Sequence, residues 1–252
     1  MIYQVVNSTS SSIESIKKQI KNNYFTHITS EQTRQILGEI LLHYPTQNSI
    51  NEFINTWPNL ESDTFMADGG EYRERTHGVF ASSKTDNLIR LLPYQPHFQT
   101  KYYNELNGDT ARYSKEIPEQ LLKNEVFEGL MKLSHHLFFG LKPSNYYIEV
   151  HQFRINAEED TVGLPTTEGI HRDGVSYVLM AMLQRNNVDG EETEIYDLDK
   201  KPLAKFTLTD TLDIAIVDDT KVFHGVSPIY KLSTTKNEAY RDVLVITFKE
   251  MD

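Results

Sequence analysis

The second half of the chain alternates between short apolar runs and turns, and this pattern constrains the fold more than any other feature. Residues 146–155 are rich in aromatic and β-branched side chains, which favour β-strands. Similar runs recur further along, separated by turn residues, at residues 176–183, 212–217 and 243–248. Several short strands joined by turns are typical of a β sandwich or a β barrel.

Helical patterns dominate the rest of the chain. Isoleucines at 13, 16 and 20 have the spacing of one helical face, and Thr29 with Gln32 has the pattern of a capping box. Residues 117–140 combine a leucine-rich stripe with Pro118 in the expected first turn and Gly140 near the expected end. We therefore predict one domain, residues 1–252, mainly β with helical additions. Its predicted parts are a helical N-terminal segment (1–60), a supporting helix (117–140) and a β core (145–250).

Composition excludes several classes of site and partner. The chain has no cysteine, so disulfides, thiolate zinc sites, cysteine-held iron–sulfur clusters and a cysteine nucleophile are all excluded. The formal net charge is −11, and no basic block is present, so we expect no nucleic acid partner. No apolar run approaches the roughly 18 residues that a membrane span needs, so we expect no membrane partner. The N-terminus lacks the features of a secretory signal, and we expect a cytoplasmic protein.

Four polar residues in the β half suggest a metal site. His171 and Asp173 are two residues apart, and on an extended strand such residues point to the same face. His224 follows a later apolar run, and Arg241 opens the last one. Two histidines and one carboxylate are the ligand set of non-haem Fe(II) oxygenases. The alternatives are a buried polar network and a cupin-like metal site without oxygenase activity.

The same residues carry a family resemblance. The order His171–Asp173, then His224, then Arg241 resembles the Fe(II)/2-oxoglutarate dioxygenases with a double-stranded β-helix (jelly-roll, cupin-like) fold. The surrounding sequence is similar to the small bacterial family that contains L-isoleucine 4-hydroxylase, densely over residues 145–250 and more thinly over 65–115.

The resemblance implies a ligand set and a reaction. His171, Asp173 and His224 would hold Fe(II), and 2-oxoglutarate and O2 would be co-substrates. Arg241 would bind the far carboxylate of 2-oxoglutarate, and Thr247, on the same strand face, would add a hydrogen bond. The reaction would be hydroxylation of an unactivated C–H bond with release of succinate and CO2.

The sequence leaves the substrate residues open. A free amino acid needs a cation and an anion in its pocket, and an apolar slot for its side chain. The candidate residues are Arg73, Arg75, Arg112 and Arg154 as cations, Asp68 and Glu149 as anions, and Tyr147 and His151 beside Glu149. Residues 147, 149, 151 and 153 share one strand face, and the sequence does not show which face points inward.

Three hypotheses on function follow. The first is hydroxylation of a free aliphatic L-amino acid, with isoleucine first and leucine, methionine, threonine or valine after it. The second keeps the chemistry but changes the substrate to a peptidyl or carrier-tethered residue. The third is a metal-binding jelly roll that senses a ligand without turnover. Oligomeric state and the position of hydroxylation stay open.

Overall fold

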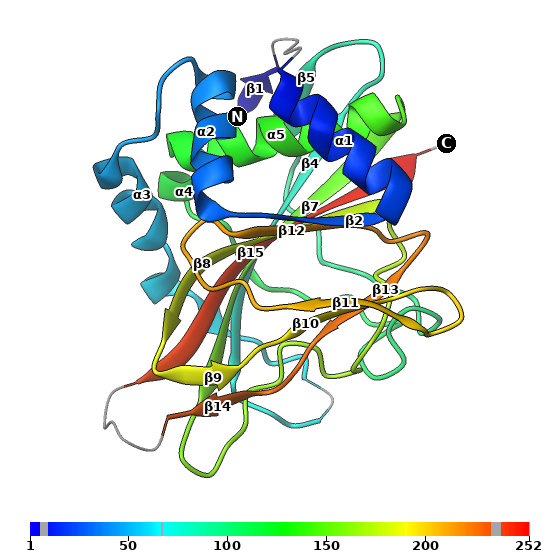
Figure 1. The fold of residues 1–252 in the computed structure, drawn as a ribbon. Helices are drawn as coiled ribbons and strands as arrows, with labels where there is room; N and C mark the ends of the chain where they lie inside the picture. The colour runs from blue at the N-terminus through cyan, green and yellow to red at the C-terminus, as the bar shows by residue number, and fades with distance from the viewer. Residues whose placement is uncertain (6–9, 67, 233–237, 252) are drawn as a thin grey trace.

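A large, mostly antiparallel sheet organises the molecule (Figure 1). The structure is a computed structural model that describes residues 1–5, 10–66, 68–232 and 238–251. In this part of the chain, ten strands belong to the large sheet, and the main path runs in the order β1-β5-β4-β7-β15-β8-β12-β2. The strands of this path are β1 (Ile2–Gln4), β5 (Leu88–Leu91), β4 (Arg73–Ser82), β7 (Asn145–Ala157), β15 (Ala239–Met251), β8 (Tyr177–Asn186), β12 (Ile214–Asp218) and β2 (Phe25–Ile28). Two short strands, β3 (Glu61–Ser62) and β6 (Lys115–Glu116), pair with β4.

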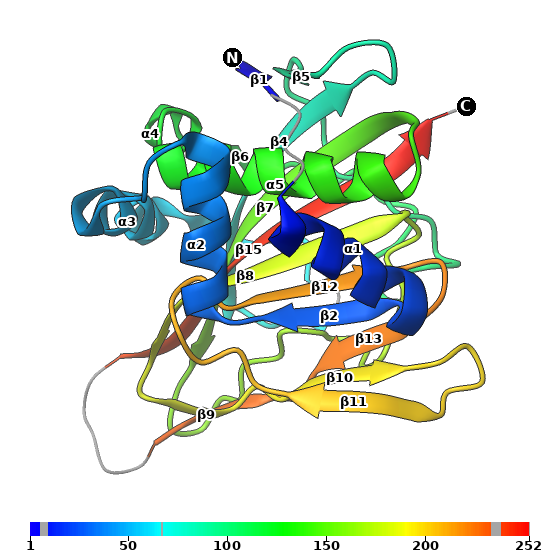
Figure 2. The same ribbon diagram turned by 45° about the horizontal axis from the view of Figure 1, so that its top comes forward.

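Helices cover one face of this sheet, as both ribbon views show (Figures 1 and 2). Side chains alternate between the two faces of a strand, so Leu244, Ile246 and Phe248 of β15 all point to the helical side and belong to the main core. The isoleucines of α1 and the leucines of α5 meet them there. The helical elements are α1 (Ser11–Asn23), α2 (Ser30–Leu41), α3 (Gln47–Ile54), η1 (Trp57–Asn59), α4 (Glu119–Leu122) and α5 (Glu125–Leu141).

A smaller layer of strands faces the other side of the large sheet. It comprises a three-stranded sheet in the order β11-β10-β13 and a two-stranded sheet of β14 and β9. Val178, Met180 and Val243 of the large sheet pack with Ile195 of the small one in a second core cluster. The strands of this layer are β9 (Val188–Gly190), β10 (Thr193–Tyr196), β11 (Pro202–Phe206), β13 (Phe223–Val226) and β14 (Ile229–Lys231).

Three sequence predictions about the parts of the chain need correction. Residues 1–60 are not wholly helical, because β1 and β2 lie at the two ends of the main strand path. The predicted helix 117–140 is two helices, since the Asn124 side chain accepts hydrogen bonds from the backbone N–H groups of Val126 (2.9 Å) and Phe127 (3.4 Å) and so starts a new helix. The β core is not confined to residues 145–250, because β4 lies beside β7 in the middle of the large sheet.

Local predictions for the first helices are confirmed. Ile13, Ile16 and Ile20 are the buried residues of α1, and Thr29 with Gln32 forms the capping box of α2. Gly140 lies inside α5 and does not end it, since the helix continues to Leu141. No helix formed by the described residues is long and apolar enough to cross a membrane.

Candidate metal centre and cofactor pocket

The two predicted histidine ligands are brought together by a short backbone pairing. His171 and His224 form an isolated antiparallel bridge, in which the N–H of each donates to the carbonyl of the other at 2.8 and 2.9 Å. His224 lies on β13, but His171 and Asp173 lie in an irregular segment between β7 and β8. The expectation that they share a face of an extended strand was therefore wrong. Gly169 and Gly174 flank the pair with φ angles of +72° and +78°, which glycine adopts without strain.

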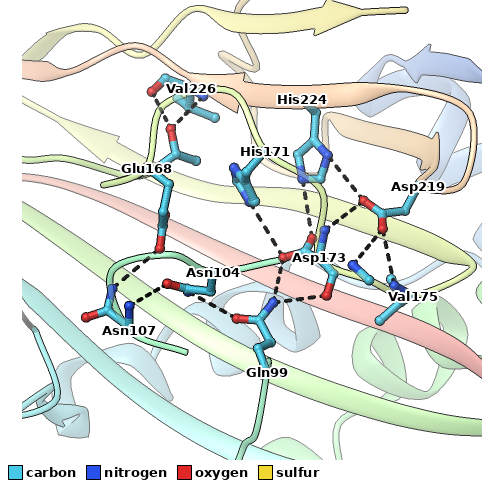
Figure 3. A network of polar contacts seen from close by, with 12 residues as sticks. Gln99, Asn104, Asn107, Glu168, His171, Asp173, Val175, Asp219, His224 and Val226 are labelled. Carbon is cyan, nitrogen blue, oxygen red and sulfur yellow. Dashed lines mark hydrogen bonds and ion pairs between the residues drawn. The ribbon is translucent and has the colours of Figure 1, made fainter. Parts of the chain in front are cut away.

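The three side chains nevertheless converge. Nε2 of His171 lies 3.6 Å from Oδ1 of Asp173, and Nε2 of His224 lies 3.4 Å from Oδ2 of the same carboxylate. Figure 3 shows both rings pointing toward Asp173. Nδ1 of His171 donates to the carbonyl of Gly169 at 3.1 Å. When the ring is neutral, this hydrogen bond leaves the Nε2 lone pair available to a metal. Two imidazoles and one carboxylate that meet in this way fit Fe(II).

Asp219 holds the backbone that carries Asp173. Its carboxylate accepts hydrogen bonds from the N–H groups of Asp173 (2.9 Å), Gly174 (2.9 Å) and Val175 (3.2 Å). Asp219 is completely buried, and its Oδ1 also lies 3.7 Å from Nδ1 of His224. In Figure 3 it lies beside Asp173 and His224, with contacts drawn to both.

Gln99 fixes Asp173 from the opposite side. Its side-chain amide donates to the carbonyl oxygen of Asp173 (3.1 Å) and to Oδ1 (3.3 Å). The side-chain oxygen Oε1 of Gln99 accepts from Arg112 (2.8 Å) and from Asn104 (3.2 Å), which orients the amide. Figure 3 shows the contact with Asn104. The candidate ligand is thus held at both ends by side chains far away in sequence.

The electrostatics of the group favour a cation. Burial alone would lower the pKa of His171, but the hydrogen bond and charge of Asp173 raise it to about 9. Burial opposes ionisation of Asp173 as well, yet the contacts with His171 and His224 hold the pKa of this carboxyl well below its usual range. A carboxylate between two imidazoles therefore attracts positive charge, from protons or from a metal ion.

Arg241 and Thr247 of β15 line the same cavity as the metal group. The cavity has a volume of about 730 Å³. Arg241 is buried, and its Nε has no hydrogen-bond partner in the part of the chain that the structure describes. Burial lowers the pKa of Arg241 to about 10, so the guanidinium stays charged at neutral pH. A buried guanidinium with a free N–H group is suited to binding a carboxylate.

A second group of guanidiniums lies on β4. Arg73 and Arg75 are buried and do not form the solvated strand face that such residues often form. Both contact the same oxygen, Oδ2 of Asp63, at 2.8 and 3.3 Å. Arg112 adds a third buried guanidinium to the cavity wall. Asp63 therefore pairs with two of these cations, and the carboxylates of Glu149 and Glu168 line the same cavity.

The structure also decides which face of β7 points inward. Tyr147, Glu149, His151 and Phe153 line the cavity, next to Arg73 and Arg75 on the neighbouring strand. Two of the other candidates are elsewhere. Arg154 pairs with Asp242 through two contacts of 2.7 Å, and Asp68 accepts from the Tyr72 hydroxyl outside the cavity.

Sequence reasoning missed four polar residues around the cavity. They are Asp219, Gln99, His77 and His97. His77 is two residues beyond Arg75 on one strand. Because side chains alternate along a strand, its place on the same face as Arg75 could be predicted. Gln99 and His97 lie in a loop, where no periodic signal exists.

Comparison with known proteins identifies the family. A protein-family model with the description "2OG-Fe dioxygenase" matches residues 55–247 of the chain. The chain belongs to this family. The dioxygenase is 25% identical over 220 residues to L-isoleucine-4-hydroxylase of Bacillus thuringiensis, which covers 85% of this chain and 89% of that protein. It is also 25% identical over 162 residues to 3(1)-hydroxy-L-isoleucine 4-dioxygenase of Pantoea ananatis (strain AJ13355), covering 62% of this chain and 65% of that protein.

A solved structure supports the fold of the dioxygenase. A bsmA homologue from Methylobium petroleophilum PM1 has a TM-score of 0.85 and 27% identity, covering 98% of this chain and 97% of that one. The jelly-roll fold class, the resemblance to isoleucine hydroxylases and the assignment as an enzyme are thereby confirmed. The dioxygenase uses Fe(II), 2-oxoglutarate and O2, as its family implies.

Proposed function

We propose that this dioxygenase hydroxylates a free aliphatic L-amino acid and releases succinate and CO2. L-isoleucine is the first candidate, and leucine, methionine, threonine and valine follow. The observation that carries the proposal is one cavity that joins a two-histidine, one-carboxylate group to buried cations, a buried carboxylate and apolar strands. A zwitterion with an apolar side chain needs all of these. The names of the two similar enzymes, which act on isoleucine or its hydroxylated form, support the same substrate class.

In this proposal His171, Asp173 and His224 hold the iron, with Asp219 and Gln99 fixing the position of Asp173. Bound iron would supply the activation of O2, coupled to oxidative decarboxylation of 2-oxoglutarate. Arg241 pairs with the far carboxylate of 2-oxoglutarate, and the Thr247 hydroxyl adds a hydrogen bond.

The remaining candidates bind the amino acid. We assign Arg73, Arg75, Tyr147, Glu149 and His151 to substrate binding, because all five line the cavity. Val178, Met180 and Val245 offer an apolar surface for the aliphatic side chain. The task of these residues is to hold one C–H bond at the metal, since a shift of about 1 Å is enough to change rate or position of attack.

A succinate assay tests the proposal. The protein is purified without oxygen and given Fe(II) and 2-oxoglutarate, then air, with each free amino acid in turn. One aliphatic amino acid should stimulate succinate formation and gain one oxygen atom, which mass spectrometry detects. His171→Ala should abolish both, whereas His43→Ala, at an exposed histidine, should not.

Other outcomes favour the alternatives. Amino acid-independent succinate formation alone would favour a peptidyl or carrier-tethered residue. Absence of any Fe(II)-dependent consumption of 2-oxoglutarate would favour a sensor without turnover. We further propose that residues 1–252 act as one domain in the cytoplasm, and one cooperative unfolding transition is the result expected of one domain.

A further inference from the structure

A second cluster of titratable side chains lies on the wall formed by β4 and β7, apart from the metal group. It consists of His77, His97, Glu149 and His151, all of them buried. His77 and His151 are direct cross-strand partners, and Glu149 precedes His151 by two residues on the same face. His97 comes from the loop after β5 and lies beside them through a backbone bridge to Arg112.

Two imidazoles hold one oxygen of Glu149. Nε2 of His77 and Nδ1 of His97 lie 3.1 and 2.8 Å from Oε1. Burial raises the pKa of Glu149, but these two contacts outweigh it and lower the pKa to about 2. The side chain is thus an anion at neutral pH. Within the described residues no donor reaches Oε2, and Glu149 lines the cavity.

His151 separates this anion from a cation. Nη2 of Arg75 lies 3.3 Å from Nδ1 of His151, and because a guanidinium only donates, this nitrogen accepts. Burial, and the nearby charges of the cluster and of Arg75, keep the pKa of His151 well below its usual range, so the ring is neutral. Arg75 itself is almost fully buried, and its Nε has no partner among the described residues.

The wall therefore presents an anion and a cation on either side of one neutral imidazole. An α-amino acid carries an ammonium and a carboxylate on one carbon, and this arrangement matches both. Charge-assisted hydrogen bonds to each group are stronger than neutral ones, and the low dielectric constant of a protein interior strengthens them further.

A metal ion is the competing occupant, since the four ligand atoms lie within 4.8 Å of one another. Two features argue against it. Glu149 is the only anion of the cluster, and the positive charges of Arg75 and Arg112 act on His97 and His151, which disfavours a divalent cation there. Nδ1 of His151 is already engaged by Arg75. A monovalent ammonium that donates hydrogen bonds is the better match.

We propose that Glu149 binds the α-ammonium group of the substrate, that Arg75 binds its α-carboxylate, and that His77 positions Glu149 without touching the substrate. This assignment rests on the proposed amino acid hydroxylase function. The assignment fixes the orientation of the bound amino acid along β4 and β7. Its apolar side chain is then free to lie toward Val178 and Met180.

Binding of matched ligands tests the assignment. Anaerobic calorimetry on the Fe(II)- and 2-oxoglutarate-loaded enzyme would compare L-isoleucine with 3-methylpentanoic acid, which lacks the amine, and 2-methylbutylamine, which lacks the carboxylate. Wild type should prefer L-isoleucine to both. In Glu149→Gln, the ratio of the affinity for L-isoleucine to that for 3-methylpentanoic acid should fall by about 10- to 100-fold. In Arg75→Lys, the preference for L-isoleucine over 2-methylbutylamine should fall instead. Glu168→Gln, at another cavity carboxylate, is the matched control and should keep both preferences.

His77 needs a pair of variants. His77→Gln keeps an N–H donor for Glu149 and should retain most of the preference for L-isoleucine, whereas His77→Leu should lose it. In turnover, His77→Leu should raise KM for the amino acid more than it lowers kcat, because the residue acts only on substrate binding. Circular dichroism would verify that each variant is folded.

Each outcome separates this assignment from the function on which it rests. If wild type binds none of the aliphatic amino acids, the proposed function fails and the assignment fails with it. If wild type binds L-isoleucine and Glu149→Gln keeps the full preference for the amine, only the assignment is wrong. Elemental analysis gives a third outcome. A second equivalent of divalent metal that Glu149→Gln and His77→Leu both lose would overturn the ammonium site in favour of a metal site.

Discussion

Asp219 offers a sharp test of how the metal group is held. Its carboxylate accepts three backbone N–H groups, from Asp173, Gly174 and Val175, and it is completely buried. In Asp219→Asn the amide has one accepting oxygen, so at least one of these N–H groups faces an NH2 group. Hydrogen bonds to a charged acceptor contribute about 1.5–3 kcal/mol each, and a lost one leaves a buried donor unsatisfied. We expect the variant to lose about 2–4 kcal/mol of unfolding free energy.

The effect should extend to metal binding, since the same N–H groups position Asp173. Removing a group that orients a metal ligand typically lowers affinity by about 10- to 100-fold. Thermal unfolding of the metal-free protein should show a decrease of roughly 5–15 °C, and anaerobic titration with Co(II) as a probe should show the weaker binding.

Asp218→Asn is the matched control for this experiment. The Asp218 carboxylate accepts from the backbone N–H (3.0 Å) and hydroxyl (2.6 Å) of Thr220 in the adjoining turn, away from Asp173. It should change stability by less than about 1 kcal/mol and leave Co(II) affinity unchanged. The reasoning is refuted if Asp219→Asn binds Co(II) as wild type does, or if Asp218→Asn weakens binding equally.

Three further predictions concern the cofactor, pH and the core. Arg241→Met should raise the Kd for 2-oxoglutarate by about 100-fold in an anaerobic titration, and Thr247→Val by about 10-fold or less; equal effects would contradict their assigned roles. Because the pKa of Glu149 is lowered to about 2 from 4.5, its carboxylate stabilises the fold above pH 4.5, and this contribution is lost as pH falls toward 2. Urea titrations from pH 6 to 2 should show that the free energy of unfolding falls less in Glu149→Gln than in wild type. Leu244→Ala, on the helical face of β15, should cost about 2–5 kcal/mol by urea unfolding yet leave Co(II) affinity unchanged, since it lies across the sheet from the cavity.

Local signals carried much of the prediction. The capping residues Thr29 and Gln32 lie within one turn of the groups they satisfy, so the sequence alone places them. The alternation of side chains along a strand predicted that Arg241 and Thr247 share a face, and that residues 147, 149, 151 and 153 do. The break at Asn124 shows the limit of such signals. An apolar stripe runs through it, and only the cap geometry decides that a new helix starts there.

The sequence by itself determined the mainly β class, the strand periodicity and the order of the candidate ligands, because each depends on residues close together along the chain or on a recognisable pattern. Tertiary structure alone decided which face of β7 lines the cavity, since alternation is symmetric until a neighbouring layer covers one side. It also brought Asp219 to the backbone of Asp173 and His97 to Glu149. Hydrogen bonds of this kind join segments that only chain folding places side by side, and no local preference encodes them.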